Sequence, residues 1–431
     1  MIRCILVLFA LLVLTQSAWA QTCEADASRE RFSQIDQYAA SAPMDAEKDI
    51  ESLVKYLIKP AKTDVEKLRA LYAWVTHKVA YDTEEYFSGN YSNKDPEEAF
   101  KSRKSICGSF AALYKAMARL ADVDVLKVDG DAKGFGYASG TPFSGPGNHS
   151  WNAVKIDGKW RLLDCAWGAG YVASDRKFVY KFSEFYFLAT PQQFIYTHFP
   201  FDPKLQFLDK PMSKQDFINC PNLRPGFFEK KLDMLDEYHG KIKSDGMIEL
   251  TLSSPEDVAL QVRLRRGEEK IDDSYAFVQK EQDNWKVRAT FPSDGTYTIK
   301  LFAKSKEAQG NYEWVADYLV DNVAKDGSPK ELPKMLGAFY TRQACLHHPM
   351  SGRLKPNTVE NFNISAPGAE NVSVVVSGKW INLQKSGNDF AGDVEVDSGE
   401  ILVVAKYPGS SSADVLLKYN ASAGSTVAKS N

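Results

Sequence analysis

The sequence predicts an α+β protein, with a mixed helical and antiparallel core followed by two β-sandwich modules. Apolar residues recur at helical spacing over about residues 24–80 and again just after Cys107. A β-hairpin is predicted within residues 147–168, because the turn dipeptide at 157–158 (Asp-Gly) lies between two apolar runs. Beyond about residue 205, alternating apolar and polar residues between Ser, Pro and Gly turns predict strands. Helices followed by antiparallel strands define this fold class.

Composition and charge limit the partners of the chain. Its 431 residues, 44% hydrophobic and 25% charged, are enough for two to four ordered domains. A net charge of −3 and a sequence without a basic stripe give no support to a nucleic-acid partner or an anionic membrane surface. The sequence has no phosphate-binding glycine loop, and "CLHHP" at 345–349 has no companion ligands, so we expect no cofactor and no bound metal.

Residues 1–20 have the pattern of a signal peptide. Arg3 precedes an apolar run at 5–14, and Ala18-Trp19-Ala20 forms a small-x-small cleavage site. We expect cleavage after Ala20 and a secreted or periplasmic mature protein without a membrane span. A signal anchor is the alternative, although the run is shorter than the roughly 20 residues of a comfortable span.

Cysteine usage is consistent with a reactive thiol. Cys4 would leave with the signal peptide. The five remaining cysteines are Cys23, Cys107, Cys165, Cys220 and Cys345. An odd number in an oxidising compartment leaves one thiol unpaired, and it is equally consistent with no disulfide at all.

The predicted elements of the core follow in a clear order. The strongest helical pattern is "DVEKLRALYAWVTHKVAYD", and Asp95-Pro96 begins a further helix. The helix after Cys107 presents one apolar face made of Phe110, Leu113, Tyr114, Met117 and Leu120. The strand "VDVLKVDG", a Gly-rich loop at 134–147 and the hairpin come next.

Two β-sandwich modules are predicted after the core. "GMIELTLSSPEDVALQVRLRRG" and "NWKVRATFPSDGTYTIKLFAK" match "TVENFNISAPGAENVSVVVSGKW" and "NDFAGDVEVDSGEILVVAKYP" in order and spacing. We interpret them as successive immunoglobulin-like modules, with a single larger β domain as the alternative. The predicted boundaries are 1–20 for the signal peptide, 24–204 for the core, 205–224 for a connecting segment, 225–330 and 335–421 for the modules, and 422–431 for a flexible tail.

The hairpin places two titratable side chains on one face. With the turn at 157–158, the residue numbers of any two facing residues add up to the same value. His149 is therefore expected to face Ala166, and Trp151 to face Asp164. Side chains alternate along a strand, which makes His149 and Asp164 diagonal neighbours about 7–8 Å apart at the backbone. A carboxylate there can accept a proton from one imidazole nitrogen and leave the other nitrogen free.

Cys107 is the candidate nucleophile. It lies at the start of an amphipathic helix, where backbone N–H groups and the helix dipole stabilise a thiolate. Lys101, Arg103 and Lys104 add positive charge nearby. A structural cysteine is the alternative, but the His and Asp on one strand face complete the order that a cysteine-based acyl-transfer site needs.

Several stretches resemble a known family. "ICGSFAALYKAMARLADVDVLKVDGDAKG" and "NHSWNAVKIDGKWRLLDCAWGAGYV" resemble the transglutaminase-like superfamily of papain-like cysteine enzymes. "YAWVTHKVAYDTEEYF" upstream and "FYFLATPQQFIYTHFPFDPKLQFL" downstream are similar to the group of kyphoscoliosis peptidase and hillarin. The resemblance covers about residues 45–235, and the β modules are similar to those that follow the core in that group. It implies a papain-like core in which Cys107 is the nucleophile, His149 the base and Asp164 the orienting acid.

The resemblance implies acyl transfer on a protein or peptide substrate through a thioester at Cys107. Two departures favour a peptidase or amide hydrolase over a crosslinking enzyme. "AFKSRKS" lacks the Gln that papain-like enzymes often place before the cysteine, and Gly108 stands where crosslinking transglutaminases typically have Trp. The second oxyanion donor therefore remains unassigned.

Other residues receive structural roles, and one alternative function stays open. Trp151 and Trp167 are candidate walls of the substrate cleft, with core packing as the alternative, and Cys165 is expected to be structural. His198 receives no chemical role. The alternative function is a catalytically silent scaffold whose β modules bind a protein, matrix or cell-wall partner.

Overall fold

The structure, a computed structural model, describes residues 30–92, 94–236, 240–324 and 331–422. The predicted signal peptide lies outside these residues, as does the predicted tail beyond residue 422. The chain divides into two compact units. Unit 1 comprises Met1–Gly136 with Phe143–Met212, and unit 2 comprises Tyr137–Pro142 with Ser213–Asn431.

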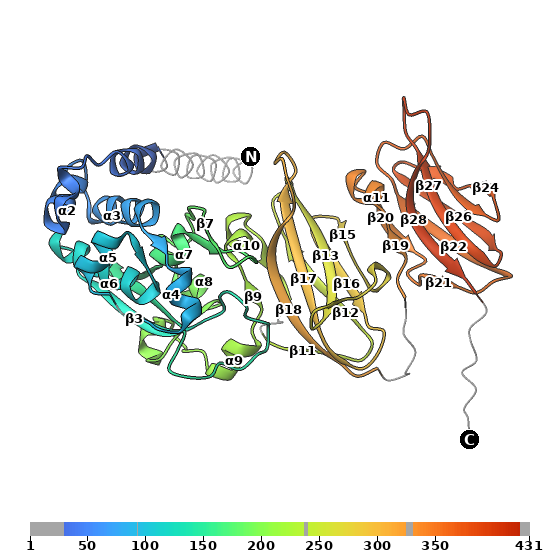
Figure 1. The fold of residues 1–431 in the computed structure, drawn as a ribbon. Helices are drawn as coiled ribbons and strands as arrows, with labels where there is room; N and C mark the ends of the chain where they lie inside the picture. Colours follow the sequence, from blue (N-terminus) through green and yellow to red (C-terminus); the bar gives the residue numbers. More distant parts are fainter. Residues whose placement is uncertain (1–29, 93, 237–239, 325–330, 423–431) are drawn as a thin grey trace, which may run out of the picture. The chain divides into compact units, whose positions relative to one another are not determined.

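Unit 1 combines short helices with one main antiparallel sheet (Figure 1). Residues 30–40 are helical. The helices that follow are η1 (Ala46–Lys48), α2 (Ile50–Leu57), α3 (Asp64–Lys78), α4 (Thr83–Ser88), α5 (Pro96–Ser102), α6 (Cys107–Leu120), α7 (Cys165–Ala169), α8 (Pro191–Phe194) and η2 (Pro203–Gln206). The strands are β1 (Ala80–Tyr81), β2 (Lys104–Ser105), β3 (Val125–Ala132), β4 (His149–Ile156), β5 (Lys159–Leu163), β6 (Gly170–Val172), β7 (Phe178–Tyr180) and β8 (His198–Pro200).

Helix starts in unit 1 follow the sequence signals. The side chain of Asp95 accepts the backbone N–H of Glu98, whose own side chain accepts the N–H of Asp95, so α5 begins with a full capping box. The face predicted for α6 is buried except at Leu120, which is 46% exposed because the helix ends there. Capping thus marks the start of α5, and apolar spacing marks the buried face of α6.

The main sheet of unit 1 has the strand order β5-β4-β3-β8, and every pair is antiparallel. Ile156 pairs with Lys159, and the turn residues Asp157 and Gly158 have positive φ values of 49° and 76°, as the predicted hairpin requires. β5 ends at Leu163, so the predicted pairing of residues 149 and 166 does not form.

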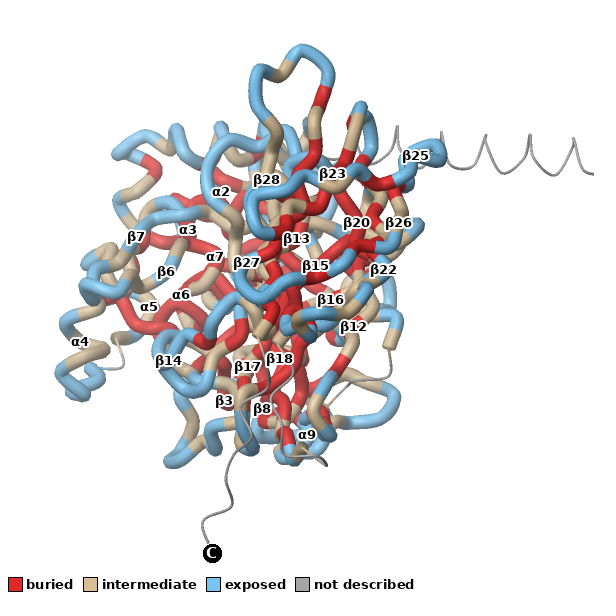
Figure 2. The backbone as a smooth tube through the Cα atoms, turned by 90° about the vertical axis from the view of Figure 1, so that its right-hand side faces the viewer, coloured by how far each residue is buried: buried red, intermediate tan, exposed pale blue. Residues whose placement is uncertain are grey.

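Helix α6 packs against this sheet, so that the first residues of α6 lie beside the sheet. α6 contacts both β3 and β4. The Nδ2 of Asn152 on β4 donates to the carbonyl of Ala111 on α6 at 3.0 Å, inside the buried core. Buried residues concentrate in these strands and in the central helices, while most connecting loops are exposed (Figure 2). Within the described residues, no helix combines the length and apolar character that a membrane span requires.

Unit 2 is built mainly from strands. Its helices are α9 (Lys214–Asn219), α10 (Pro225–Glu229), η3 (Asp273–Tyr275) and α11 (Gly337–Thr341). Its earlier strands are β9 (Asn222–Leu223), β10 (Asp233–Met234), β11 (Ile242–Ser244), β12 (Met247–Ser253), β13 (Val258–Arg266), β14 (Glu269–Lys270), β15 (Ala276–Glu281), β16 (Asn284–Thr290), β17 (Gly295–Ser305) and β18 (Glu313–Asn322). Its later strands are β19 (Lys334–Met335), β20 (Cys345–His348), β21 (Arg353–Leu354), β22 (Thr358–Ser365), β23 (Asn371–Val376), β24 (Lys379–Asn382), β25 (Gln384–Ser386), β26 (Asp389–Val396), β27 (Gly399–Lys406) and β28 (Asp414–Ala421).

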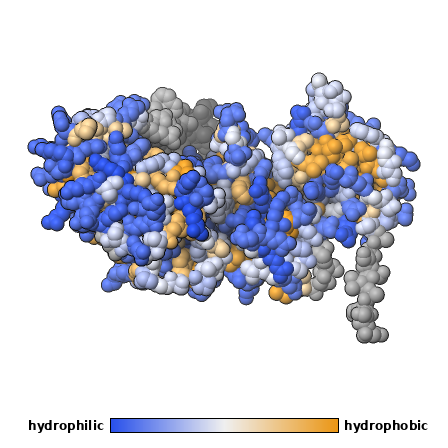
Figure 3. Space-filling model, viewed as in Figure 1, coloured by the Kyte–Doolittle hydropathy of each residue, from blue (hydrophilic) through white to orange (hydrophobic). Residues whose placement is uncertain are grey.

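These strands form two successive pairs of sheets. The first pair has the orders β10-β12-β16-β15 and β11-β18-β17-β13-β14, and the second has β19-β28-β27-β23-β24 and β20-β22-β26-β25. In the second pair, buried side chains from both sheets form one hydrophobic core. Among the described residues no ladder joins one pair to the other, which favours two modules over one larger β domain. Figure 3 shows apolar residues gathered at the surface over β27.

Two short segments belong to unit 2 rather than to the core. Residues 213–224 were expected in a connecting segment, but β9 pairs with β18 and so joins the first pair of sheets. Tyr137–Pro142, from the Gly-rich loop, also belongs to unit 2. There the hydroxyl of Ser139 donates to Oδ2 of Asp317 at 3.3 Å, and Gly140 lies against the side chain of Leu319.

Candidate active site

Cys107 is the first residue of α6, as predicted. Ile106 precedes it at the helix N-cap and offers no side-chain cap, so the first N–H groups of the helix point toward the site without a capping acceptor. The helix has 14 residues, and its dipole favours negative charge at this end. Cys107 is 9% exposed, so the thiol lies just below the surface of unit 1.

Arg103 and Lys104, which precede Cys107, pair with carboxylates instead of the thiol. The guanidinium of Arg103 lies over the ring of Trp74 and pairs with Glu47 at 3.2 Å. Lys104 pairs with Glu84 at 2.8 Å. These cations are neutralised elsewhere, which corrects the expectation that they add positive charge at the thiol.

His149 begins β4, and its imidazole meets the carboxylate of Asp164. The Nε2 of His149 lies 2.7 Å from Oδ2 of Asp164, and both side chains are buried. The predicted proximity is confirmed, although its cause differs from a strand diagonal. The chain turns after Leu163, so that Asp164 becomes the N-cap of α7, where its Oδ1 accepts the N–H of Trp167 at 3.0 Å.

The thiol of Cys107 lies against the other side of the His149 imidazole. Cys107 hydrogen-bonds to His149 and accepts the backbone N–H of Ser150. Since Nε2 of His149 is engaged by Asp164, Nδ1 is the nitrogen that faces the sulfur. The structure therefore brings together the three residues predicted from the sequence, in the order thiol, imidazole, carboxylate.

The charges of the three groups support an ion pair. Burial alone would raise the pKa of the Cys107 thiol, but the positive His149 and the hydrogen bonds to it outweigh burial and lower that pKa below 9.0. Burial opposes the charged imidazole, yet Asp164 and Cys107 raise the pKa of His149 to about 10. Burial likewise opposes the carboxylate, but His149 and His198 hold the pKa of Asp164 well below its usual value. These shifts all act in favour of a thiolate, an imidazolium and a carboxylate.

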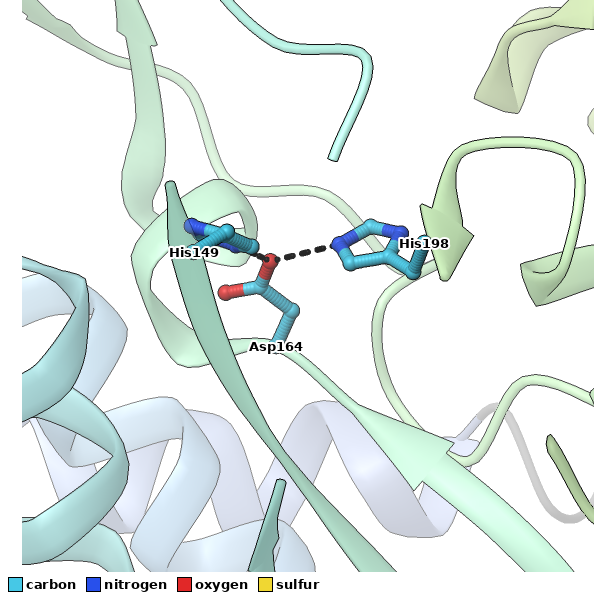
Figure 4. A group of neighbouring side chains, drawn as sticks. All are labelled: His149, Asp164 and His198. Carbon is cyan, nitrogen blue, oxygen red and sulfur yellow. Dashed lines mark hydrogen bonds and ion pairs between the residues drawn. The ribbon is translucent and has the colours of Figure 1, made fainter. Parts of the chain in front are cut away.

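His198 is a fourth member of this site, and the sequence analysis missed it. Its Nε2 lies 3.1 Å from the same Oδ2 of Asp164, so that the two imidazoles approach the carboxylate from opposite sides (Figure 4). His198 is 1% exposed and lies on β8, where it pairs with Ala132 of β3. No spacing rule connects residue 198 to the hairpin; the only available signal was a polar residue within the apolar run "FIYTHFPF".

The same three side chains have donor atoms suited to a metal ion. One ligand atom from each of His149, Asp164 and His198 lies within 4.8 Å of the others. However, both Nε2 atoms are hydrogen-bonded to one carboxylate oxygen. These hydrogen bonds already occupy the ring nitrogens and the carboxylate oxygen that would bind a metal. The arrangement therefore fits a hydrogen-bond network better than a metal centre.

Tyr81 also reaches the sulfur. The hydroxyl of Tyr81 hydrogen-bonds to Cys107, and burial together with the neighbouring thiolate raises the pKa of this phenol, which keeps it protonated. Parallel pairing of β1 with β2 sets Tyr81 opposite Ser105, two residues before the cysteine. The ring stacks against Phe110 and lies 6.4 Å from Phe178.

The two predicted wall residues have different surroundings. Trp167 is half-buried, and its ring lies 4.9 Å from that of His149. Trp151 is 1% exposed, because Phe194 and His198 cover it at 6.1 and 5.1 Å. Trp151 is therefore packed in the core, the alternative given for it, where it lines a small cavity together with Phe194 and His198. Cys165 is buried as well, and burial raises the pKa of its thiol well above the usual value.

Comparison with known proteins identifies the domains. Residues 51–165 match the family model described as the transglutaminase-like superfamily, and the match includes Cys107, His149 and Asp164. Unit 1 contains a transglutaminase-like domain. This confirms the resemblance found in the sequence. Residues 214–334 match the model of the KY-like, immunoglobulin-like domain, so the transglutaminase-like domain is followed by an immunoglobulin-like one.

Curated relatives agree with this assignment. The chain is 31% identical to kyphoscoliosis peptidase of Homo sapiens over 277 residues, which are 64% of this chain and 41% of that protein. It is 29% identical to kyphoscoliosis peptidase of Mus musculus over 324 residues, 74% of this chain and 48% of that protein. It is 28% identical to hillarin of Drosophila melanogaster over 223 residues, 49% of this chain and 27% of that protein. The chain thus spans less than half the length of each of these relatives.

Proposed function

We propose that the transglutaminase-like domain is a cysteine-dependent acyl-transfer enzyme that hydrolyses an amide bond in a protein or peptide. The observation that carries the proposal is the continuous chain from the Cys107 thiol through His149 to Asp164, with 2.7 Å between imidazole and carboxylate. A buried ion pair of this kind provides a nucleophile and a proton donor at neutral pH.

The reaction follows from the protonation states. The thiolate of Cys107 attacks the amide carbonyl carbon, a C–S bond forms, and the carbonyl oxygen becomes an oxyanion. The oxyanion collapses, the C–N bond breaks, and the imidazolium of His149 gives its proton to the departing amine. Water then attacks the thioester while His149 takes the water proton, so that the carboxylic acid leaves and the thiolate is restored. Asp164 orients the imidazole throughout and keeps its own charge.

Two hydrogen-bond donors are available for the oxyanion. One is the backbone N–H of Cys107, at a helix end without a side-chain cap. We assign the second to the hydroxyl of Tyr81, because it already reaches the sulfur to which the tetrahedral carbon becomes attached. In the tetrahedral intermediate the oxyanion is two bonds away from the sulfur. A donor in contact with the sulfur therefore lies close to the position of this oxyanion. This assignment supplies the second donor that the sequence left unassigned.

Hydrolysis and export complete the proposal. Gly108 follows the nucleophile in place of the Trp typical of crosslinking enzymes, which supports hydrolysis over transfer to a second amine. The signal-like residues 1–20 support a secreted or periplasmic enzyme.

The test begins with the thiol and continues with the substrate. Iodoacetamide alkylation of Cys107 should persist well below pH 8.5 in the wild type and be lost there in His149→Ala. A denatured protein offered together with a fluorescent primary amine then separates the reactions, because hydrolysis yields fragments and crosslinking yields labelled substrate. Ordinary thiol titration in both proteins would overturn the enzyme and leave the binding scaffold as the better explanation.

A further inference from the structure

We infer that His198 is a positioning residue of the active site, one that donates a hydrogen bond from its Nε2–H to Asp164 and so fixes the carboxylate that orients His149. The inference deepens the proposed function and rests on it. It extends the chain of side chains to Cys107, His149, Asp164 and His198.

The hydrogen bonds around His198 define its tautomer. Nδ1 of His198 lies 2.9 Å from Oγ1 of Thr197, and Nε2 lies 3.1 Å from Oδ2 of Asp164. The ionised carboxylate can only accept, so Nε2 carries the proton. In the neutral ring Nδ1 is then an acceptor, and the hydroxyl of Thr197 donates to it at 2.9 Å in preference to the carbonyl of Phe194 at 3.4 Å. The backbone holds this pair in place, since the carbonyl of Thr197 accepts the N–H of Lys133 at 2.9 Å.

The surroundings keep His198 neutral. Its ring stacks on Phe194 at 3.9 Å and lies 4.5 Å from Trp167, inside an aromatic cage. Burial lowers the pKa of His198 to about 4, and the positive His149 acts in the same direction against the raising effect of Asp164. His149 and Asp164 are the charged groups that face this ring.

Neighbouring elements do not change this balance. On β3, Ala132 is directly opposite His198, so the side chains of Asp131 and Lys133 project from the other face of the sheet. Tyr186 packs edge-on at 6.2 Å from the ring of His198. Neutral His198 and charged His149 therefore share one carboxylate without repelling each other.

Both carboxylate oxygens of Asp164 consequently accept hydrogen bonds that fix its orientation. Oδ1 accepts the N–H of Trp167, while Oδ2 accepts one N–H from each histidine. Without the His198 donor, the carboxylate would lose one of three bonds that stabilise its charge, and its hold on the imidazolium of His149 would weaken. The thiolate of Cys107 would then require a higher pH to form.

A matched pair of variants separates the hydrogen bond from the packing. His198→Phe keeps an aromatic ring on Phe194 and removes the donor, whereas His198→Gln removes the ring and keeps an N–H at the position of Nε2. The readout is the rate of iodoacetamide alkylation at Cys107 in the full chain from pH 4 to 9, followed on the Cys107 peptide by mass spectrometry. It needs no substrate.

The expected result is a selective shift. The midpoint of the alkylation profile should rise by about one pH unit in His198→Phe, which makes the reaction about tenfold slower at pH 6, and should stay within a few tenths of a unit in His198→Gln. Equal shifts in both variants would assign His198 to packing, and unchanged profiles in both would remove it from the site; either result overturns the inference while the enzyme stands. An ordinary thiol in the wild type would overturn the enzyme and the inference together.

One more variant covers the case in which His198→Phe does not fold. Thr197→Val keeps the histidine and the shape of its neighbour but removes the hydroxyl that donates to Nδ1. The alkylation midpoint should rise here too, by less than in His198→Phe. A profile identical to that of the wild type would contradict the tautomer on which the inference depends.

Discussion

The carboxylate of Asp164 caps the helix that contains Trp167, because Oδ1 of Asp164 accepts the backbone N–H of Trp167 at 3.0 Å. Its other oxygen, Oδ2, faces His149. One side chain thus both caps a helix and holds the imidazole that we propose as the catalytic base. The two functions can be separated by substitution, since Asn is as good an N-cap as Asp but carries no charge.

For Asp164→Asn we therefore expect a loss of activity without a loss of fold. The amide oxygen can still cap α7, while the imidazolium of His149 loses its negative partner. kcat/KM should fall by about 10³- to 10⁴-fold, and the melting temperature should fall by less than in Asp164→Ala. The measurement is amide hydrolysis together with thermal unfolding. Asp164→Ala, which removes the cap as well, should lower both, and a fully active Asp164→Asn would exclude the carboxylate from the mechanism.

Replacement of the nucleophile has a simple expected outcome. Cys107→Ala should reduce hydrolysis to background, because no other described thiol faces His149. Cys345→Ser is the control: it alters a buried cysteine of β20, in the second pair of sheets, whose pKa burial raises to about 12. The control should keep wild-type turnover. Turnover that survives in Cys107→Ala would mean that the activity measured belongs to another site or another protein.

The pH dependence of kcat/KM should be bell-shaped. The acid limb reports formation of the Cys107 thiolate, at a pH below the ordinary thiol pKa of 9.0, and the basic limb reports loss of the His149 proton near pH 10. Activity is therefore expected between the two limbs, with an acid limb below pH 9.0. Initial rates at low substrate concentration, in buffers of constant ionic strength, would measure the profile. Activity that rises only above pH 9 would indicate a neutral thiol rather than an ion pair.

Tyr81→Phe tests the assignment of the second oxyanion donor. The substitution keeps the ring between Phe110 and Phe178 and removes only the hydroxyl. kcat should fall by about 10²- to 10³-fold with little change in KM, because an oxyanion donor acts on the transition state rather than on the bound substrate. Tyr86→Phe, on a ring 5.8 Å away, is the matched control. Equal kcat values for the two variants would leave the second donor to another group.

The buried neutral His198 should make stability depend on pH. The folded protein holds this ring neutral down to about pH 4, whereas the unfolded chain takes up its proton near pH 6.5. Between these values the unfolded state binds more protons, so the free energy of unfolding should decrease as pH falls from 6.5 to 4, by about 3 kcal/mol for this one group. Urea denaturation of the full chain at pH 7 and pH 4.5 would measure the decrease, and His198→Phe should reduce it. The same slope in the variant would assign acid sensitivity to other groups.

The sequence predicted local features of the site well and long-range ones poorly. Helical spacing placed Cys107 at a helix start, and the Asp-Gly turn set the register of the hairpin whose first strand begins at His149. Such signals depend on residues close together in the chain. The turn of Asp164 into a helix cap was also readable, because Asp is a preferred N-cap, but strand alternation was extended one residue too far.

Tyr81 and His198 could not be found in the same way. Tyr81 reaches Cys107 through the pairing of β1 with β2, and His198 reaches Asp164 through the pairing of β8 with β3. Periodicity reports which face of an element is buried, but it does not report which elements lie side by side. For the same reason Trp151 was expected at a cleft: the segment that covers it lies more than forty residues away along the chain.

The path of the chain between β3 and β4 has a consequence for inheritance. Residues 137–142 belong to the immunoglobulin-like unit, and the backbone returns from them to His149 within seven residues. Recombination could thus not transfer the transglutaminase-like domain from one gene to another as an independent unit. A transfer without residues 213–431 would leave this loop without its packing partners, a few residues before His149. We expect the two units to have been passed on together, with changes on β18 matched by changes in the loop.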